Sequence, residues 1–142
     1  MTVREASLED INEIEKVEKD NFTPEDFGMS RSSLRYHLKR NILFVVEEKG
    51  RVVGYCLWLR RKEYYRLYSI AILQESHARG FGKMLLDYSI KKLRDKALQL
   101  EVKQTNLHAE SLYKKFGFKI VKTLRSYYPN GIDGYLMKRA IS

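Results

Sequence analysis

Apolar residues follow two different periods along the chain, and the first forty residues show the helical one. Four of them recur three positions apart, which is the spacing of one helix face: Leu8, Ile11, Ile14 and Val17. Ser7 stands just before them, where a helix-capping residue is expected. We therefore predict a first helix that ends at about Asp20, and a second that runs from Ser30 or Ser32 to about Arg40.

Residues 42–61 show the pattern of a β-hairpin. Two runs of β-branched and aromatic residues flank a turn at Lys49 and Gly50. Similar runs elsewhere in the chain predict five more strands: residues 2–6, 63–73, 98–102, 119–128 and 134–139.

Two further helices are predicted in the second half of the chain. One starts in the stretch Ser76–Leu86 and continues with apolar residues on one face: Leu86, Ile90, Leu93 and Ala97. Asn106 is placed to cap the other helix, and Gly117 to end it. Its apolar stripe consists of Ala109, Leu112, Tyr113 and Phe116.

The order β-α-α-β-β-β-α-β-α-β-β predicts an α/β (α+β) sandwich, in which helices cover the faces of a mixed sheet. A chain of 142 residues is expected to form a single domain, here 1–142. Because only one cysteine is present, an internal disulfide is excluded, and we expect Cys56 to be a small buried apolar side chain.

The charge of the chain favours an anionic partner. The formal net charge is +9 and the pI about 9.6, which suits nucleic acid, a ribosome or a phosphorylated cofactor. No stretch approaches the roughly 18–20 apolar residues of a membrane span, and the N-terminus lacks the apolar centre of a signal peptide. We therefore expect a cytoplasmic protein without membrane contact.

Two glycines, Gly80 and Gly82, stand at the start of the predicted helix in the stretch "SHARGFGKMLL". Glycine costs roughly 1 kcal/mol relative to alanine inside a helix, so its use there needs a reason. The first turn of a helix exposes unpaired N–H groups and a partial positive charge, which together bind phosphate. Side chains would keep a diphosphate away from those groups, whereas Arg79 and Lys83 would add positive charge beside it.

The sequence "HARGFG" resembles the acyl-CoA loop of the Gcn5-related N-acetyltransferases (GNAT). That family has Gln or Arg, two further residues, Gly, one residue, then Gly or Ala; here His77 takes the first position. The segments "YSIAILQESHARGFGKMLL" and "LEVKQTNLHAESLYKKFGF" are similar to the family in the same order. The segment "RSYYPNGIDGYLMKR" resembles the closing hairpin of the branch that acetylates protein N-termini, including the ribosomal-protein alanine acetyltransferases.

The resemblance implies a mixed, mostly antiparallel sheet of six or seven strands with helices on both faces. It also implies a V-shaped split between the strand "YSIAIL" and the strand "LQLEV", in which acetyl-CoA pairs with backbone like an extra strand. The cofactor-binding residues that it implies are Ile70, Ala71, Ile72, Ala78, Arg79, Gly80, Phe81, Gly82, Lys83 and Asn106. Asn106 can equally be a helix cap alone.

The same resemblance implies two catalytic residues and no metal. Glu101 is the lone charged residue of an apolar strand and is expected to act as general base, through a water molecule. Tyr113 is expected to protonate the leaving thiolate, although its place on an apolar stripe also suits a core residue. A backbone N–H near Ile72 would stabilise the oxyanion.

Proton arithmetic favours an α-amine as the acceptor. At pH 7, removing the proton costs roughly 1–1.4 kcal/mol from an α-amine and about 4.6 kcal/mol from lysine. We therefore expect a protein or peptide N-terminus, such as that of a ribosomal protein. The candidate substrate-binding residues are Glu25, Phe27, Tyr127 and Tyr128, of which the last two can also be ordinary strand tyrosines.

Other functions stay open at this point. The same fold could acetylate lysine or a small amine, such as an amino sugar, an amino acid or a polyamine. A basic RNA- or ribosome-binding module and an acyl-CoA sensor are the non-catalytic alternatives. The sequence shows neither an RNP-type aromatic motif nor a helix-turn-helix, so we expect no sequence-specific nucleic-acid binding. It does not indicate the oligomeric state.

Overall fold

The computed structural model describes residues 1–22 and 29–141. In these ranges the chain forms a seven-stranded sheet with the order β1-β2-β3-β4-β5-β7-β6. The strands are β1 (Thr2–Glu5), β2 (Ile42–Glu48), β3 (Arg51–Arg60), β4 (Tyr64–Ile72), β5 (Ala97–Lys103), β6 (Lys119–Tyr128) and β7 (Ile132–Arg139). Only β4 and β5 pair in parallel, which confirms the mixed, mostly antiparallel sheet that the sequence predicts.

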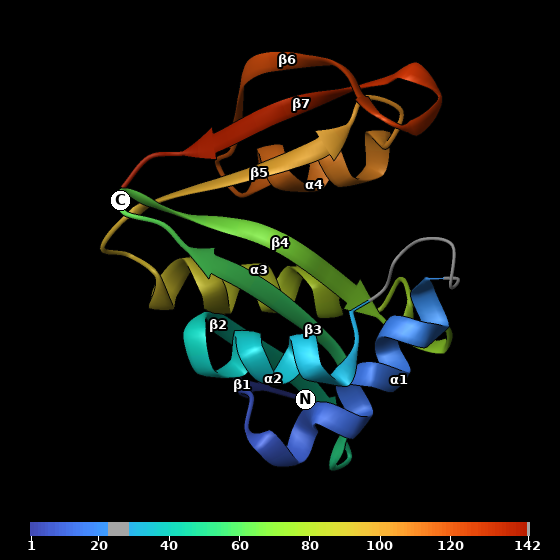
Figure 1. Ribbon diagram of the computed structural model, residues 1–142. Helices are drawn as coiled ribbons and strands as arrows, with labels where there is room; N and C mark the ends of the chain where they lie inside the picture. The colour runs from blue at the N-terminus through green and yellow to red at the C-terminus, as the bar shows by residue number, and fades with distance from the viewer. Residues whose placement is uncertain (23–28, 142) are drawn as a thin grey trace.

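Helices cover both faces of this sheet (Figure 1). They are α1 (Ile11–Asn21), α2 (Arg31–Arg40), α3 (Phe81–Lys92) and α4 (Leu107–Lys115). The first two bury Ile14, Val17 and Leu34 against one face. The other two bury residues such as Leu85 and Tyr113 against the opposite face. Within the described ranges, no helix is both long and apolar enough to cross a membrane.

Most predicted boundaries hold within one or two residues, and two predictions at helix ends are wrong. Leu8 is 65% exposed and belongs to a short 3-10 turn, so the apolar face of α1 begins at Ile11. The third helix ends at Lys92, and Ala97 is the first residue of β5. The backbone of Leu93 has already left the helical conformation, with φ −105° and ψ 49°.

The predicted split between β4 and β5 is present. The two strands pair only at their starts, where Tyr64, Tyr65 and Arg66 face residues 97–99. Beyond this point they diverge, as Figure 1 shows between the green and the orange strand. The parallel pairing therefore forms the apex of a V whose arms are the second halves of β4 and β5.

A β-bulge near this apex reverses the side-chain alternation of β4. Leu67 faces Trp58 on β3, but the next pair along the ladder joins Leu57 to Ser69, so Tyr68 is an extra residue. An extra residue shifts every later side chain to the other face of the sheet. As a result Arg66 and Ser69, three positions apart, lie on the same face.

Candidate active site

The turn before α3 exposes backbone N–H groups, as the glycine pattern predicts. Gly80 is the N-cap and has a left-handed backbone with φ +86°, which favours glycine. The first N–H of the helix with an intrahelical partner is that of Met84, which donates to the Gly80 carbonyl. A Cβ atom on Gly82 would meet nothing within 4 Å, so packing does not require glycine there. The free space in front of Gly82 and the unpaired N–H groups together fit a diphosphate.

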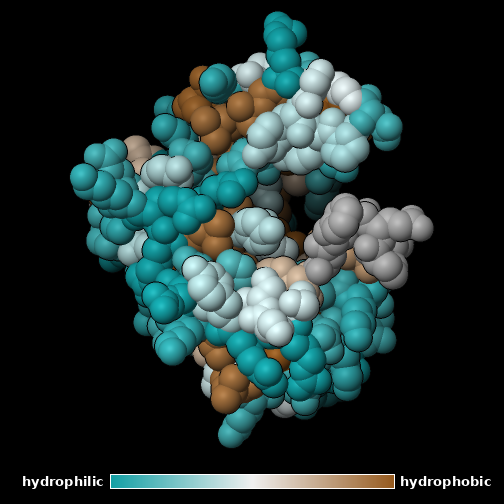
Figure 2. Space-filling model, viewed as in Figure 1, coloured by the Kyte–Doolittle hydropathy of each residue, from teal (hydrophilic) through white to brown (hydrophobic). Residues whose placement is uncertain are grey.

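A cavity of about 670 Å³ lies against this turn. Its walls come from the end of β4, the turn before α3, and α4: Ile72, Ser76, His77, Ala78, Gly80, Phe81, Gly82, Lys83, His108 and Leu112. Six of the ten predicted cofactor residues therefore line one hollow, and a volume of this size suits a cofactor. Figure 2 shows the molecule hollowed on the side where the split opens.

Two of the predicted cofactor residues have other partners. The Arg79 guanidinium forms an exposed ion pair with Glu48 and lies 5.1 Å from the ring centroid of Phe81. Its side chain is not among those that line the cavity. Asn106 caps α4, since its side-chain oxygen accepts the N–H of Ala109 at 3.1 Å. The structure thus supports the helix-cap interpretation of Asn106 and gives the positive charge of Arg79 a protein partner.

The edge of β4 directs alternate backbone groups into the split. The Leu73 N–H donates to the Val53 carbonyl at 2.8 Å, so in this antiparallel ladder Ala71 is bonded to β3. The N–H groups of Ile70 and Ile72 consequently point away from β3 and toward the split. The backbone N–H and carbonyl of Ala71 face β3 and cannot bond to a ligand in the split. Of the three cofactor-binding residues predicted in β4, only Ile70 and Ile72 can therefore do so.

His77, which departs from the family pattern, bonds back to the end of β4. Its Nε2 lies 2.8 Å from the carbonyl oxygen of Ile72, and the side chain of Asn21 donates to the same oxygen at 2.9 Å. A carbonyl only accepts hydrogen bonds, so the proton of the imidazole is on Nε2 in this arrangement. His77 therefore joins the turn before α3 to the strand that borders the split.

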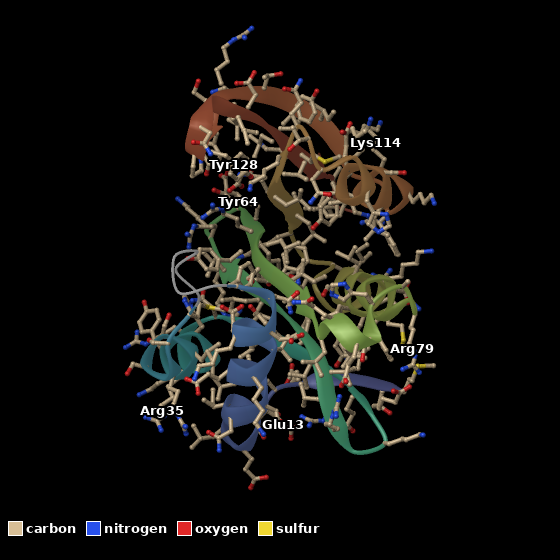
Figure 3. All side chains as sticks on the ribbon, turned by 90° about the vertical axis from the view of Figure 1, so that its right-hand side faces the viewer. Glu13, Arg35, Tyr64, Arg79, Lys114 and Tyr128 are labelled. Carbon is tan, nitrogen blue, oxygen red and sulfur yellow. The ribbon has the colours of Figure 1, made fainter. Side chains whose placement is uncertain are left out.

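A second opening lies on the other face of the sheet, with a volume of about 330 Å³. Its lining residues come from β4, β5 and the closing hairpin, with Arg61 beside them: Arg61, Tyr64, Arg66, Gln99, Glu101, Leu124, Tyr127 and Leu136. Figure 3 looks into the split and shows Tyr64 and Tyr128 on its two sides. This opening is the candidate acceptor site.

Glu101 is fixed inside this opening by two neighbours. The Nε atom of Arg66 lies 2.9 Å and 3.1 Å from its two carboxylate oxygens, and a second guanidinium nitrogen also donates to it. The Tyr127 hydroxyl donates to the same carboxylate at 3.3 Å. The Glu101 side chain is only 10% exposed. A largely buried carboxylate held in this way can accept a proton or a hydrogen bond in one defined direction.

The hydroxyls of Tyr128 and Tyr113 interact electrostatically with each other, and that of Tyr128 also with Glu101. Burial raises the pKa of Tyr128 to about 12, with smaller contributions from Glu101 and Tyr127. Burial likewise raises the pKa of Tyr113 to about 12, followed by the effects of Cys56 and Tyr128. Both hydroxyls are thus protonated at neutral pH and can act as hydrogen-bond or proton donors. Tyr113 is 8% exposed and packs in the core, as the alternative interpretation expects, and its catalytic role stays a prediction.

The remaining predictions concern two acceptor-site residues, the cysteine and a metal site. Glu25 and Phe27 lie outside the described residues. Cys56 is buried, and burial raises the pKa of its thiol to about 12, as expected for an unreactive side chain. Among residues 1–22 and 29–141 there is no group of three or more His, Cys, Asp or Glu residues that could hold a metal ion.

Sequence reasoning missed Arg66 as a site residue. In the sequence, Arg66 closes the basic stretch 60–66, a pattern that is typical of an exposed strand end. One feature distinguishes it: Arg66 is a lone cation in the strand next to the one that carries the lone anion Glu101. Two isolated opposite charges on neighbouring strands are a usable indication of a buried pair.

Comparison with known proteins agrees with this arrangement. A model of the acetyltransferase (GNAT) family matches residues 8–118. An N-alpha-acetyltransferase from Sulfolobus acidocaldarius is 36% identical over 155 residues, which cover 95% of this chain and 89% of that protein. A ribosomal protein bS18-alanine N-acetyltransferase from Haemophilus influenzae is 30% identical over 135 residues, with coverages of 93% and 88%. The crystal structure of the ribosomal-protein-S18-alanine N-acetyltransferase from Escherichia coli has a TM-score of 0.88 at 24% identity, covering 99% of this chain and 94% of that one. The chain therefore belongs to the GNAT family of acetyltransferases.

Proposed function

We propose that this chain is an N-α-acetyltransferase, which transfers the acetyl group of acetyl-CoA to the N-terminal amine of a protein, such as a ribosomal protein. Membership of the GNAT family implies acetyl-CoA as the donor. The observation that carries the proposal is the pair of openings on opposite faces of the split, one beside the helix N-terminus and one around Glu101. The identity to N-α-acetyltransferases over nearly the whole chain supports the choice of acceptor.

On the donor side of the site, backbone N–H groups bind the phosphorylated cofactor. The unpaired N–H groups at the start of α3 and the side chain of Lys83 would hold the diphosphate. The N–H groups of Ile70 and Ile72 would pair with the extended arm and with the carbonyl oxygen of the acetyl group. When bound, acetyl-CoA supplies an activated acetyl thioester, so the protein has only to place the amine and move protons.

The acceptor side supplies the base. The carboxylate of Glu101, fixed by Arg66 and Tyr127, takes the proton of the α-amine through a water molecule. The hydroxyl of Tyr113 returns a proton to the leaving sulfur from the opposite face. Tyr127 and Tyr128, whose rings meet edge to face at 5.1 Å, border the path of the peptide.

An α-amine suits this machinery better than lysine does. At pH 7, the free energy needed to deprotonate the amine is roughly 1–1.4 kcal/mol for an α-amine and about 4.6 kcal/mol for lysine. One carboxylate with a water molecule supplies the smaller amount more easily. We also propose that the transfer needs no metal ion and that residues 1–142 work as one domain. A cytoplasmic location stays a prediction.

A panel of acceptors tests the proposal. The chain is incubated with acetyl-CoA and with peptides that have a free N-terminus, the same peptides with a blocked N-terminus, and small amines. Mass spectrometry is expected to place the acetyl group on the N-terminal nitrogen of the free peptides, with no product from the blocked ones. Acetylation of a lysine side chain, or faster turnover of an amino sugar or polyamine, would contradict the proposal. Full activity in EDTA is expected in every productive reaction.

A further inference from the structure

Glu18, Tyr55 and Ser69 form a chain of hydrogen bonds that runs from the protein core to β4 at the split. The Tyr55 hydroxyl donates to one carboxylate oxygen of Glu18 and lies 2.8 Å from the Ser69 hydroxyl. The Met29 N–H donates to the other oxygen of Glu18 at 2.8 Å. Glu18 is 3% exposed and Tyr55 is fully buried, whereas Ser69 is half-buried. Only the serine end of the chain is therefore open to a ligand.

The hydrogen-bond inventory of the three side chains determines where each proton lies. A tyrosine hydroxyl has one hydrogen, and that of Tyr55 is directed at Glu18. The contact between Tyr55 and Ser69 must then use the hydrogen of Ser69. With its only hydrogen turned inward, Ser69 presents nothing but lone pairs outward. Burial raises the pKa of Glu18, and the hydrogen bond from the Met29 N–H lowers it. Because Tyr55 and Met29 donate to its two oxygens, the side chain of Glu18 acts only as an acceptor, as an ionised carboxylate does.

The β-bulge places Ser69 on the acceptor face of the sheet. Its partner Leu57 packs against α1 and α2, and Leu59, the partner of Arg66, packs in the same cluster. Ser69 and Arg66 therefore lie on one face, the one on which the Arg66–Glu101 pair lines the acceptor opening. Ser69 is also next to Ile70, whose N–H points into the split. A hydrogen-bond acceptor thus stands beside the place where an amine has to meet the acetyl group.

We propose that the Ser69 hydroxyl oxygen accepts a hydrogen bond from the amine of the acceptor, and that Tyr55 and Glu18 are positioning residues which hold the hydroxyl in the accepting orientation. This inference rests on the proposed function, since it assigns a residue to the amine of that reaction. One N–H of the amine bonded to Ser69 leaves the nitrogen lone pair free to turn toward the carbonyl carbon. Tyr55 and Glu18 touch no substrate and act through Ser69 alone.

Steady-state kinetics with a peptide acceptor and acetyl-CoA tests the inference. Ser69→Ala is expected to raise the acceptor KM about tenfold, the upper order expected when a hydrogen bond between neutral groups is lost, and to leave the acetyl-CoA KM unchanged. Ser69→Thr retains a hydroxyl and is expected to restore most of the acceptor affinity. Tyr55→Phe should raise the acceptor KM in the native background but not in the Ser69→Ala background. Thermal unfolding shows that each variant is folded.

Tyr65→Phe is the matched control, because it removes another buried tyrosine hydroxyl that is bonded to a carboxylate, Asp95, on the opposite face. Its acceptor KM is expected to equal that of the native chain. An unchanged acceptor KM in Ser69→Ala would overturn the inference, as would an equal effect of Tyr55→Phe in both backgrounds. Absence of any α-amine turnover by the native chain would instead overturn the proposed function, and the inference with it.

Discussion

Arg66 holds both carboxylate oxygens of Glu101 at the last rung of the pairing between β4 and β5. The pair thus sits at the apex of the split, where the two strands part. A planar guanidinium that meets a carboxylate in this way restricts both its position and its rotation. The protein has therefore fixed its candidate base from the neighbouring strand, independently of any bound ligand.

Replacement of Arg66 is expected to lower turnover without loss of cofactor binding. Arg66→Met keeps most of the side-chain length and removes the donors that orient Glu101, so we expect kcat to fall about 10- to 100-fold. The affinity for CoA, measured by calorimetry, should stay within twofold. Arg35→Met is a suitable control, because Arg35 is an exposed cation of α2 outside the site (Figure 3). A normal kcat in Arg66→Met would show that Glu101 does not need this orientation.

Replacement of Glu101 should have an effect that depends on pH. In Glu101→Gln the base is lost, whereas the deprotonated fraction of an α-amine rises as the pH approaches and passes about 7.7–8.0. The rate relative to the native chain is therefore expected to be lowest near pH 6.5 and to recover toward pH 9. A ratio of the two rates that is constant across this range would contradict the role of Glu101 as proton acceptor.

Removal of the Tyr113 hydroxyl separates catalysis from packing. Tyr113→Phe retains the ring that packs against Phe118, so the melting temperature at neutral pH should change little. Turnover is expected to fall by ~10²-fold if the hydroxyl protonates the leaving thiolate. Full activity of Tyr113→Phe, measured by release of CoA, would make Tyr113 a core residue and nothing more.

The same variant should also change the stability of the protein in alkali. The pKa of Tyr113 is raised from 10 to about 12, so its contribution to stability is complete below pH 10 and is lost as the pH rises to 12. A shift of this size corresponds to roughly 2–3 kcal/mol. Urea unfolding of Tyr113→Phe is expected to show a smaller loss of stability between pH 10 and pH 12. An identical loss in both chains would refute this expectation.

Gly82 offers a test in which stability and binding move in opposite directions. A Cβ on Gly82 meets no protein atom, so Gly82→Ala should stabilise the first turn of α3 by up to about 1 kcal/mol. The larger Gly82→Val should weaken CoA binding at least tenfold, or about 1.4 kcal/mol, because its side chain fills the space in front of the N–H groups. Unchanged CoA affinity in a folded Gly82→Val chain would rule out this turn as the phosphate site.

Several features of the fold were predictable because they depend on local chemistry. Ser30 and Asn106 cap helices through side-chain oxygens, as their positions in the sequence indicate. The hairpin turn at Lys49 and Gly50 has two left-handed residues, the geometry of a type I′ turn. The conformation of Gly80 is likewise a local property, which a glycine before a helix already suggests.

The remaining features depend on contacts between distant segments. The hydrogen bond between Arg66 and Glu101 joins residues 35 positions apart in the sequence, and the one between Glu18 and Tyr55 joins residues 37 positions apart. Periodicity assigns such residues to a face but does not select their partners. Arg79 illustrates the reverse error, since its position beside the glycines suggested a phosphate contact, while Glu48 of β2 provides its ion pair.

The extra residue Tyr68 has a consequence for how β4 can vary among proteins of this design. Its side chain is 52% exposed, so many residue types should be tolerated at this position. Loss of the bulge with the residue kept is a different matter, because Tyr68 would then pair with Leu57 and every later position of β4 would turn over. Ser69 would exchange faces with Ile70, and the N–H groups that border the split would come from Ala71 instead of its two neighbours. Deletion of Tyr68 should by contrast preserve the faces, because it leaves the pair of Leu67 with Trp58 and the pair of Ser69 with Leu57 as consecutive pairs of a regular ladder. The two halves of the site thus depend on which β3 residues they pair with, and not on the number of residues between them.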